Sequence, residues 1–261
     1  MIIKSGALDS LSVSVILPTY NELENILLLV RQLDVVLSER SYEIIVVDDD
    51  SPDGTWRVVE QEMLHNSSLR LIRRVTEQGL TSALNAGIDS AKGDIVVWLD
   101  SDLQHPPEVI PQLLAPIDRG ADVVSGSRFV HERVSDERTQ NWRETQTEVW
   151  VHGQLSRFLS FVISKILNRR FSDWTSGYIA IRRKIFDHYC LEGFYGEYYI
   201  SLLNYCLIQG YKIIEVPYTL NLRLLGYSKS TGYGYSRLFI LGTRYITVVL
   251  RLLVKKILRN G

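Results

Sequence analysis

Two aspartates and a glutamine follow a short apolar run near the middle of the chain, and their types and spacing suit metal chemistry. The run Ile95 to Leu99 predicts a buried strand, and Asp100, Asp102 and Gln104 come directly after it. In extended chain, residues two apart point to the same side, so these three side chains are expected to converge. Two carboxylates and an amide oxygen suit a hard divalent cation such as Mg2+ or Mn2+, which can neutralise a departing diphosphate. The alternative is a polar strand exit that binds no metal.

The elements that must position this group alternate between strand and helix patterns. Apolar runs predict strands over residues 12–17, 42–47, 69–73, 95–99, 121–127 and 211–217, and helical spacing predicts helices over 26–37, 56–63, 79–91, 149–167 and 193–210. This order predicts an α/β fold whose mostly parallel sheet is flanked by helices. In such sheets ligands bind beyond the carboxyl ends of the strands. Asn21 is expected to cap the first helix, with Glu24 in its first turn.

The bulk composition narrows the class of protein. The chain has 261 residues, a net charge of −1 and two cysteines. This length allows one large domain or one domain with an appendage, and a charge near zero gives no general attraction to nucleic acid. Cys190 and Cys206 are spaced neither like metal ligands nor like a disulfide framework, so we expect reduced thiols in a cytoplasmic protein. We expect no signal segment and no membrane-spanning helix, because charges interrupt every long apolar stretch.

Other polar groups at the predicted strand ends are candidates for binding a phosphorylated ligand. The three aspartates over 48–50 place like charges together, which suits hydrogen bonds to a base or ribose; otherwise they form a solvated loop. The small residues from Gly79 onward let a backbone approach a phosphate closely, or simply begin a helix. Arg73 and Arg74 are either surface charges or partners of a diphosphate. We include Arg73 and Gly79 among the predicted donor-binding residues.

Four segments in order carry a resemblance to a known family: LPTYNE (17–22), VVDDDSPDGT (46–55), GLTSALNAG (79–87) and WLDSDLQHPPE (98–108). Together they resemble family 2 glycosyltransferases of the GT-A (Rossmann-like) fold, and SPDGT and DLQHPPE are similar to dolichyl- or polyprenyl-phosphate mannose synthases. The resemblance implies a metal ion at Asp100, Asp102 and Gln104. It also implies a nucleotide-sugar donor whose base and ribose lie near Pro18, Tyr20, Glu22 and Asp49. Asp50 departs from the family, which usually has glycine there.

The second half of the chain supplies the predicted acceptor site. The strand over 121–127 delivers Arg128 to the same sheet edge, and an arginine offers phosphate a planar fork of donors. Ser156 falls where the family binds the acceptor phosphate, although His152 stands where the family tends to have arginine. The segment RLLGYSK (223–229) resembles the family's R-x-x-G-x-S-K. The predicted acceptor-phosphate residues are Arg128, Ser156, Arg223 and Lys229; the alternatives are ordinary surface charges and a basic loop.

Two acidic residues complete the predicted catalytic set of Asp100, Asp102, Arg128, Asp173 and Glu197. Asp173 opens DWTSGY (173–178), which resembles the family's D-P-T-S-G-F with tryptophan in place of proline. It is expected either to approach the sugar or to order the site. Glu197 lies four residues before Ser201, where the family usually has an acid, and is either a substitute for that acid or a solvated residue.

The C-terminal segment is apolar but interrupted by arginine and lysine. Over residues 236–259 this pattern suits an amphipathic helix lying in a membrane interface, with the basic residues reaching anionic headgroups. The alternative is a helix packed on the domain or on a partner subunit. We therefore expect a catalytic domain over 1–230, an interfacial helical segment over 231–261, and a peripheral position on the cytoplasmic face of a membrane.

These features predict an enzyme that moves a hexose, in first place mannose from GDP-mannose, onto a polyprenyl or dolichyl phosphate with inversion. A phosphate monoester has a second pKa of ~6, so the acceptor is already mostly dianionic at neutral pH and needs no strong base. The alternatives within the class are a UDP-glucose donor or a sugar-hydroxyl acceptor, which does need a base.

Two other classes stay open. A non-catalytic nucleotide-sugar-binding protein is compatible with the departures at Asp50, His152, Trp174 and Ser201. A nucleotidyltransferase also uses βαβ units and metal carboxylates, but it would need a glycine-rich, basic phosphate loop after the first strand. Residues 17–22 do not supply such a loop.

Overall fold

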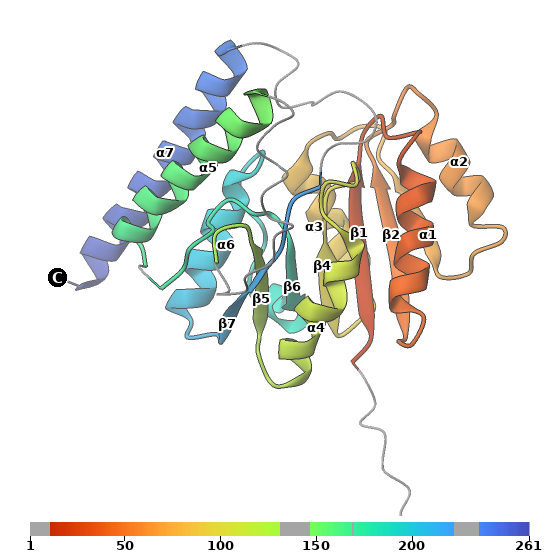
Figure 1. The fold of residues 1–261 in the computed structure, drawn as a ribbon, viewed down its shortest axis with the longest axis horizontal. Helices are drawn as coiled ribbons and strands as arrows, with labels where there is room; N and C mark the ends of the chain where they lie inside the picture. The colour runs from red at the N-terminus through yellow and green to blue at the C-terminus, as the bar shows by residue number, and fades with distance from the viewer. Residues whose placement is uncertain (1–10, 131–146, 169, 222–234, 261) are drawn as a thin grey trace, which may run out of the picture.

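The structure is a computed structural model that describes residues 11–130, 147–168, 170–221 and 235–260. One sheet of seven strands runs through the molecule with helices on both sides (Figure 1). The predicted α/β class and mostly parallel sheet are confirmed. The strands are β1 (Val13–Thr19), β2 (Tyr42–Asp48), β3 (Leu69–Arg73), β4 (Ile95–Trp98), β5 (Val123–Ser127), β6 (Ile179–Arg182) and β7 (Ile213–Pro217).

Helices connect these strands at nearly the predicted places. The α-helices are α1 (Ile26–Leu37), α2 (Thr55–Glu62), α3 (Leu80–Ser90), α4 (Ile110–Asp118), α5 (Thr147–Ile166), α6 (Glu197–Ile208) and α7 (Tyr235–Asn260). Short 3-10 turns cover Pro107–Val109 and Arg183–Asp187. The helix predicted from residue 193 begins only at Glu197, because the loop before it is folded around the carboxylate of that residue.

The strand order β3-β2-β1-β4-β6-β5-β7 gathers the functional ends at one edge. β1 is parallel to β2 and β4, and β2 is parallel to β3. β6 is antiparallel to both β4 and β5, and β5 is parallel to β7. The carboxyl ends of β1, β2, β4, β5 and β7 therefore lie at the same edge as the amino end of β6.

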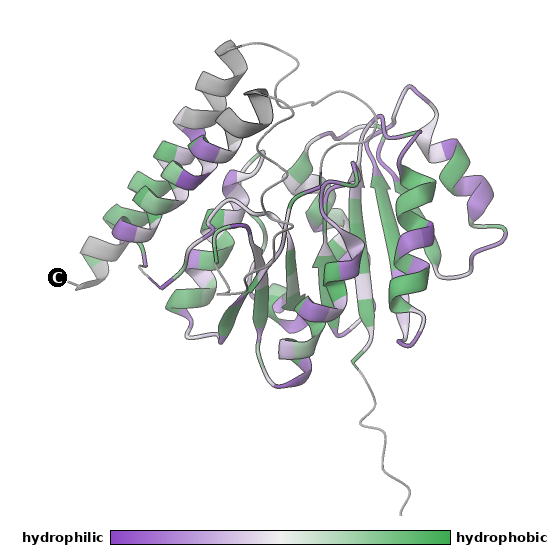
Figure 2. Ribbon diagram, viewed as in Figure 1, coloured by the Kyte–Doolittle hydropathy of each residue, from purple (hydrophilic) through white to green (hydrophobic). Residues whose placement is uncertain are grey.

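Alternating side chains of the strands feed two cores, one on each face of the sheet. In β1, Val15 and Leu17 join a core with α1 and α4, whereas Ile16 joins a core with α3, α5, α6 and α7. Figure 2 shows the central strands as largely hydrophobic, as expected for a sheet covered on both faces. Since both faces are packed, polar groups of the strands concentrate at the edges.

The expected cap at Asn21 is wrong. α1 begins five residues later, at Ile26, so Glu24 does not lie in its first turn either. Asn21 has a positive φ of 54°, and its backbone N–H donates to the Ser51 hydroxyl at 2.9 Å. The segment after β1 is thus an irregular loop tied to the end of β2, and this brings it to the carboxyl edge of the sheet.

The C-terminal helix α7 uses two different faces. Tyr245, Val249 and Leu252 pack on the core that α3, α5 and α6 also contact. A second apolar set, repeated every fourth residue, is exposed: Ile246, Leu250, Val254 and Leu258. One face of α7 therefore packs on the domain, as the alternative prediction for this segment had it, and the other apolar face is exposed. Among the described helices, none combines the length and the hydropathy that a membrane-spanning segment requires.

Candidate active site

The exit of β4 is a turn. The strand ends at Trp98, and residues 101–103 reverse the chain, with Leu103 buried at a positive φ of 65°. The prediction of extended chain over 100–104 is therefore wrong. Instead, the Gln104 N–H donates to Asp102 Oδ1 at 3.1 Å and the Asp100 N–H donates to His105 Nδ1 at 3.1 Å. These bonds fix the backbone that carries the two carboxylates.

The chemistry of this turn fits a divalent cation. The Asp100 side chain is 58% exposed, whereas Asp102 is buried beside it. Within the described ranges no three or more His, Cys, Asp or Glu side chains form a metal-holding group. The two carboxylates would therefore need further oxygen ligands, from the Gln104 amide, from water or from a bound phosphate.

Hydrogen bonds join the ends of the central strands around this turn. The Ser101 hydroxyl donates to the Pro18 carbonyl at 3.0 Å and lies 3.0 Å from the Thr19 hydroxyl. The Asp49 N–H donates to the Thr19 carbonyl at 3.1 Å. The structure therefore brings together the ends of β1, β2 and β4, which sequence reasoning placed at one site.

Asp49 organises the side of the site that is predicted to bind the donor. Its carboxylate accepts hydrogen bonds from Arg74 Nε at 2.7 Å and from the Gly79 N–H at 2.8 Å. Arg74 is buried and also donates to the Ser82 hydroxyl at 2.9 Å. Gly79 has φ +134°, which other residues rarely adopt, and directly precedes α3. The pair of Asp49 and Arg74 thus fixes the start of α3 against the end of β2.

The two neighbouring aspartates also have protein partners. Asp48 is fully buried and accepts from the Ser51 N–H and hydroxyl; burial raises its pKa. Asp50, at φ +57°, accepts from Arg73 Nε at 2.7 Å, and the Arg73 guanidinium lies 3.5 Å from the centre of the Trp56 ring. Arginines therefore pair with Asp49 and Asp50, whereas the Asp48 carboxylate is held by hydrogen bonds from Ser51.

A cavity of about 320 Å³ opens beside Gly79. Its lining comes from the segment before α3, from α3 and from the loop before α6: Glu77, Gln78, Gly79, Ser82, Gly193 and Phe194. Of the other predicted donor residues, Pro18 lies one residue before the end of β1, Tyr20 is 40% exposed and Glu22 is buried, accepting from Asn25 Nδ2 at 2.8 Å. All of them belong to the same sheet edge as the cavity.

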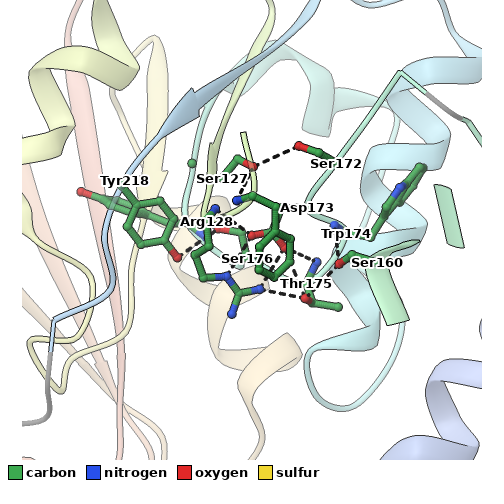
Figure 3. Close-up of polar contacts among 12 residues, drawn as sticks. Ser127, Arg128, Ser160, Ser172, Asp173, Trp174, Thr175, Ser176 and Tyr218 are labelled. Atoms are coloured by element: carbon green, nitrogen blue, oxygen red, sulfur yellow. Dashed lines mark hydrogen bonds and ion pairs between the residues drawn. The ribbon is translucent and has the colours of Figure 1, made fainter. Parts of the chain in front are cut away.

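On the predicted acceptor side, Arg128 and Asp173 form an ion pair with two parallel hydrogen bonds, drawn in Figure 3. Arg128 Nε donates to Asp173 Oδ2 and Nη2 donates to Oδ1, both at 2.9 Å. Nη2 also donates to the Thr175 hydroxyl at 2.8 Å. The Asp173 side chain is fully buried and the Arg128 side chain is 19% exposed. Although burial opposes the charge, Asp173 raises the pKa of Arg128, so the guanidinium stays protonated.

Helix α5 adjoins this pair through Ser160. The Ser160 hydroxyl accepts from the Trp174 N–H at 3.1 Å and lies 3.3 Å from the Thr175 hydroxyl (Figure 3). Ser156 lies one turn earlier, on the same face of α5. A role for Ser156 in holding the acceptor phosphate stays a prediction. The Trp174 indole N–H is buried and has no hydrogen-bond partner in the described part of the chain.

Tyr218, just after β7, connects the predicted acceptor side to the turn over residues 100–104, which carries the predicted metal ligands and is called the metal turn below. Its ring makes an edge contact with His105, with centroids 5.7 Å apart, and its hydroxyl lies 3.3 Å from the Ser176 hydroxyl. Burial raises the pKa of the Tyr218 hydroxyl, while Arg128 lowers it and Asp100 raises it. The ring and the hydroxyl of Tyr218 thus link His105 to the segment 173–176 that holds Arg128.

Glu197 is buried and is bonded to its own loop. Its carboxylate accepts from the Phe194 N–H at 2.8 Å and from the Tyr195 N–H at 3.0 Å. This accounts for the acid in structural terms, and a chemical role for it stays a prediction. Arg223, Lys229 and the polar segment 131–146 lie outside the described residues.

Sequence reasoning missed or passed over three contributors to this site. Arg73 was preferred to its neighbour, but it is Arg74 that contacts Asp49. Ser101 reads as a spacer between two aspartates and in fact joins β1 to β4. Glu215 reads as an ordinary strand residue and in fact accepts hydrogen bonds from residues 172 and 173. Arg74 lies beyond the end of β3, where strand alternation no longer applies, and the other two contacts depend on distant segments, so no local signal identified any of the three.

Comparison with known proteins shows the family of the chain. The family model described as glycosyl transferase family 2 matches residues 14–190, and the chain belongs to that family. It is 38% identical to a dolichol-phosphate mannosyltransferase of Pyrococcus furiosus over 229 residues, 85% of this chain and 60% of that protein. It is 33% identical to a polyprenol monophosphomannose synthase of Mycolicibacterium smegmatis over 225 residues, 84% of this chain and 80% of that protein. The chain thus spans less than two thirds of the Pyrococcus relative.

Solved structures give the same fold. A crystal structure of glucosyl-3-phosphoglycerate synthase from Mycobacterium tuberculosis, in complex with Mn2+, UDP and phosphoglyceric acid, has a TM-score of 0.67 and 20% identity. The match covers 93% of this chain and 78% of that one. Another crystal structure of that enzyme, with Mg2+ and UDP, has a TM-score of 0.65. The predicted GT-A fold is confirmed.

Proposed function

We propose that this protein transfers a hexose from a nucleotide sugar to a polyprenyl phosphate, with inversion at the anomeric carbon. The observation that carries the proposal is the shared edge of the sheet. There Tyr218 joins the two sides, because its hydroxyl lies 3.3 Å from that of Ser176, close to Arg128 and Asp173, and its ring contacts His105 in the turn that carries Asp100. A cation site beside an anion site is what diphosphate departure and phosphate attack need. The relatives named for dolichol-phosphate and polyprenol monophosphate mannosyl transfer support this choice.

The donor side would hold the nucleotide sugar between the Asp49 region and the metal turn. Asp100, Asp102 and Gln104 would hold Mg2+ or Mn2+, the ions bound in the structurally similar enzyme. A divalent cation there neutralises charge on the diphosphate. Pro18, Tyr20, Glu22, Asp49, Arg73 and Gly79 remain the proposed donor-binding residues. GDP-mannose is the proposed donor, on the strength of the mannosyltransferase relatives.

The acceptor side would hold the lipid phosphate on Arg128 and Ser156, with Arg223 and Lys229 as further proposed ligands. Asp173 occupies Nε and Nη2 of Arg128, and Nη1 donates to none of the described residues. The remaining nitrogen is thus available to an anion. The phosphate oxygen attacks the anomeric carbon, the bond from that carbon to the diphosphate breaks, and the configuration inverts.

A phosphate acceptor also fits the state of the two acids. Asp173 is committed to Arg128, and Glu197 to the backbone of its own loop. Neither carboxylate is arranged to take a proton from a sugar hydroxyl, and a phosphate dianion needs no such base. This favours a lipid phosphate over a sugar-hydroxyl acceptor.

A membrane surface is the proposed location of the reaction. The exposed apolar set on α7 is joined by apolar residues on α5, where Leu155, Phe158 and Phe161 are also exposed. Lys255 lies on the exposed part of α7 and could reach anionic headgroups. The unpaired cysteines Cys190 and Cys206 support a position on the cytoplasmic face.

The experiment is a donor panel. GDP-mannose, GDP-glucose, UDP-glucose and UDP-galactose would each be incubated with a short polyprenyl phosphate and Mg2+ or Mn2+, and the product analysed by mass and anomeric configuration. We expect an inverted hexosyl phosphate from GDP-mannose. If only UDP-glucose gave product, UDP-glucose would replace GDP-mannose as the proposed donor. A product with retained anomeric configuration would refute the proposed attack.

A further inference from the structure

Glu215 joins the last strand of the sheet to the segment that carries Asp173. It lies in β7, opposite Ser125 of β5. Its carboxylate accepts three hydrogen bonds: from the Ser172 N–H at 2.9 Å, from the Ser172 hydroxyl at 2.8 Å and from the Asp173 N–H at 3.0 Å. A single charged group thus fixes two successive residues.

The same short segment then fixes Arg128. The Asp173 carboxylate accepts from the Arg128 N–H at 3.0 Å as well as from the guanidinium, and from the Thr175 N–H at 3.1 Å. Ser172 also contacts the end of β5, where its hydroxyl lies 3.2 Å from that of Ser127 (Figure 3). Residues 172–175 therefore lie between Glu215 on one side and Arg128 on the other.

We propose that Glu215 is a positioning residue for acceptor binding. By fixing the backbone of Ser172 and Asp173, it sets the direction in which Asp173 holds the Arg128 guanidinium. It thereby aims the remaining nitrogen, Nη1, at the acceptor phosphate. The inference rests on the proposed function, because it needs a phosphate bound by Arg128. Glu215 acts through Asp173 and does not itself touch the substrate.

A second glutamate provides a matched control. Glu43, in β2, accepts hydrogen bonds from the Ser14 hydroxyl at 2.7 Å, from the Lys92 N–H at 2.7 Å and from Arg70. It bridges segments as Glu215 does, but near the amino end of its strand, away from the edge that carries the site. A purely structural role predicts the same consequences for the loss of either glutamate.

The test compares Glu215→Ala, Glu215→Gln and Glu43→Ala in steady-state transfer to a short polyprenyl phosphate. For Glu215→Ala we expect the KM for the lipid phosphate to rise about tenfold or more, since charge-assisted bonds that fix the site are lost. The KM for the nucleotide sugar and its metal-dependent hydrolysis should stay unchanged. Glu215→Gln, which keeps one oxygen acceptor, should recover part of the acceptor affinity. Glu43→Ala should lower the melting temperature without this selective effect.

Several results would overturn the inference. An acceptor KM in Glu215→Ala no different from that in Glu43→Ala would reduce Glu215 to a structural residue, and so would an equal loss for donor and acceptor. If Glu215→Ala does not fold, Ser172→Ala removes one of the three bonds and must still raise the acceptor KM. Wild-type protein that transfers sugar to no polyprenyl phosphate would refute the proposed function itself, and the role of Glu215 with it.

Discussion

Asp173 holds Arg128 by two parallel hydrogen bonds of 2.9 Å, and the carboxylate in this pair is fully buried. A buried carboxylate is costly unless it is paired, and a planar guanidinium is the partner that matches both of its oxygens. The pair therefore fixes a permanent positive charge at the carboxyl edge of the sheet. Its orientation is set by the protein before any ligand binds.

Arg128→Lys tests whether acceptor binding needs the planar guanidinium of Arg128 and not only its positive charge. Lysine keeps the charge but cannot bond both Asp173 oxygens and a phosphate in one plane. We expect transfer to fall by about ten- to a hundredfold, mainly through the KM for the lipid phosphate, which a titration of acceptor will measure. Arg182→Lys is the control, because Arg182 donates to backbone carbonyls of residues 117 and 121 and lies 3.9 Å from Asp122, at the far end of β6 from the site. Full activity of Arg128→Lys would contradict the assignment.

The neighbouring pair Arg73 and Arg74 gives a second comparison. Arg74 is buried against Asp49, whereas the Arg73 side chain is 38% exposed and stacks on Trp56. Removing Arg74 leaves Asp49 unpaired, so Arg74→Ala should cost about 3–5 kcal/mol of stability and weaken donor binding by tenfold or more. Arg73→Ala should cost under about 1 kcal/mol. Calorimetry of nucleotide-sugar binding and thermal unfolding measure both. A larger loss of donor affinity in Arg73→Ala would restore Arg73 as the principal donor contact.

These two arginines show where sequence reasoning reached its limit. Apolar runs and their spacing predicted the strands, the helices and the edge at which the site lies, since burial on both faces of a sheet leaves a strong pattern. Which of two adjacent arginines turns inward was not predictable without the path of the chain beyond β3. Contacts such as Ser172 with Glu215 join residues 43 apart, and no local pattern encodes them. The turn at Leu103 was missed because a positive φ at a non-glycine residue is uncommon.

Glu43 makes stability depend on pH. Burial opposes its ionisation, but hydrogen bonds from Ser14, Lys92 and Arg70 outweigh burial and lower its pKa from 4.5. A lowered pKa means that its stabilisation is present above pH 4.5 and is lost as pH falls through the folded-state value. At pH 7, Glu43→Gln should therefore lower the free energy of unfolding by about 1–2 kcal/mol, and its melting temperature should lie below that of wild type. The difference should shrink below pH 4.5 in thermal scans. A difference that is constant with pH would show that the ionised carboxylate contributes nothing.

The contact of α7 with the loop before α6 can be tested by two substitutions, of which the second should compensate for the first. A Cβ atom added at Gly196 would lie 2.1 Å from the Tyr245 hydroxyl oxygen and 3.4 Å from the adjoining ring carbon. Gly196→Ala should therefore destabilise the protein by about 1–3 kcal/mol, the usual cost of overpacking. Adding Tyr245→Phe removes the clashing oxygen and should recover most of the loss in thermal unfolding. No recovery in the double variant would contradict the packing of α7 on this loop.

The most direct measurement of the central claim is transfer of labelled sugar from GDP-mannose into the organic phase with a short polyprenyl phosphate. Wild-type protein, Asp100→Ala and the exposed control Asp89→Ala would each be assayed with Mn2+ or Mg2+ and with EDTA. We predict metal-dependent label in the lipid phase for wild type and Asp89→Ala. Asp100→Ala should lose about a hundredfold or more of that activity while its melting temperature is unchanged.

Label that enters the lipid phase equally with EDTA, or equally in Asp100→Ala, would contradict the metal-assisted mechanism. The absence of lipid product from any donor would contradict the proposed reaction.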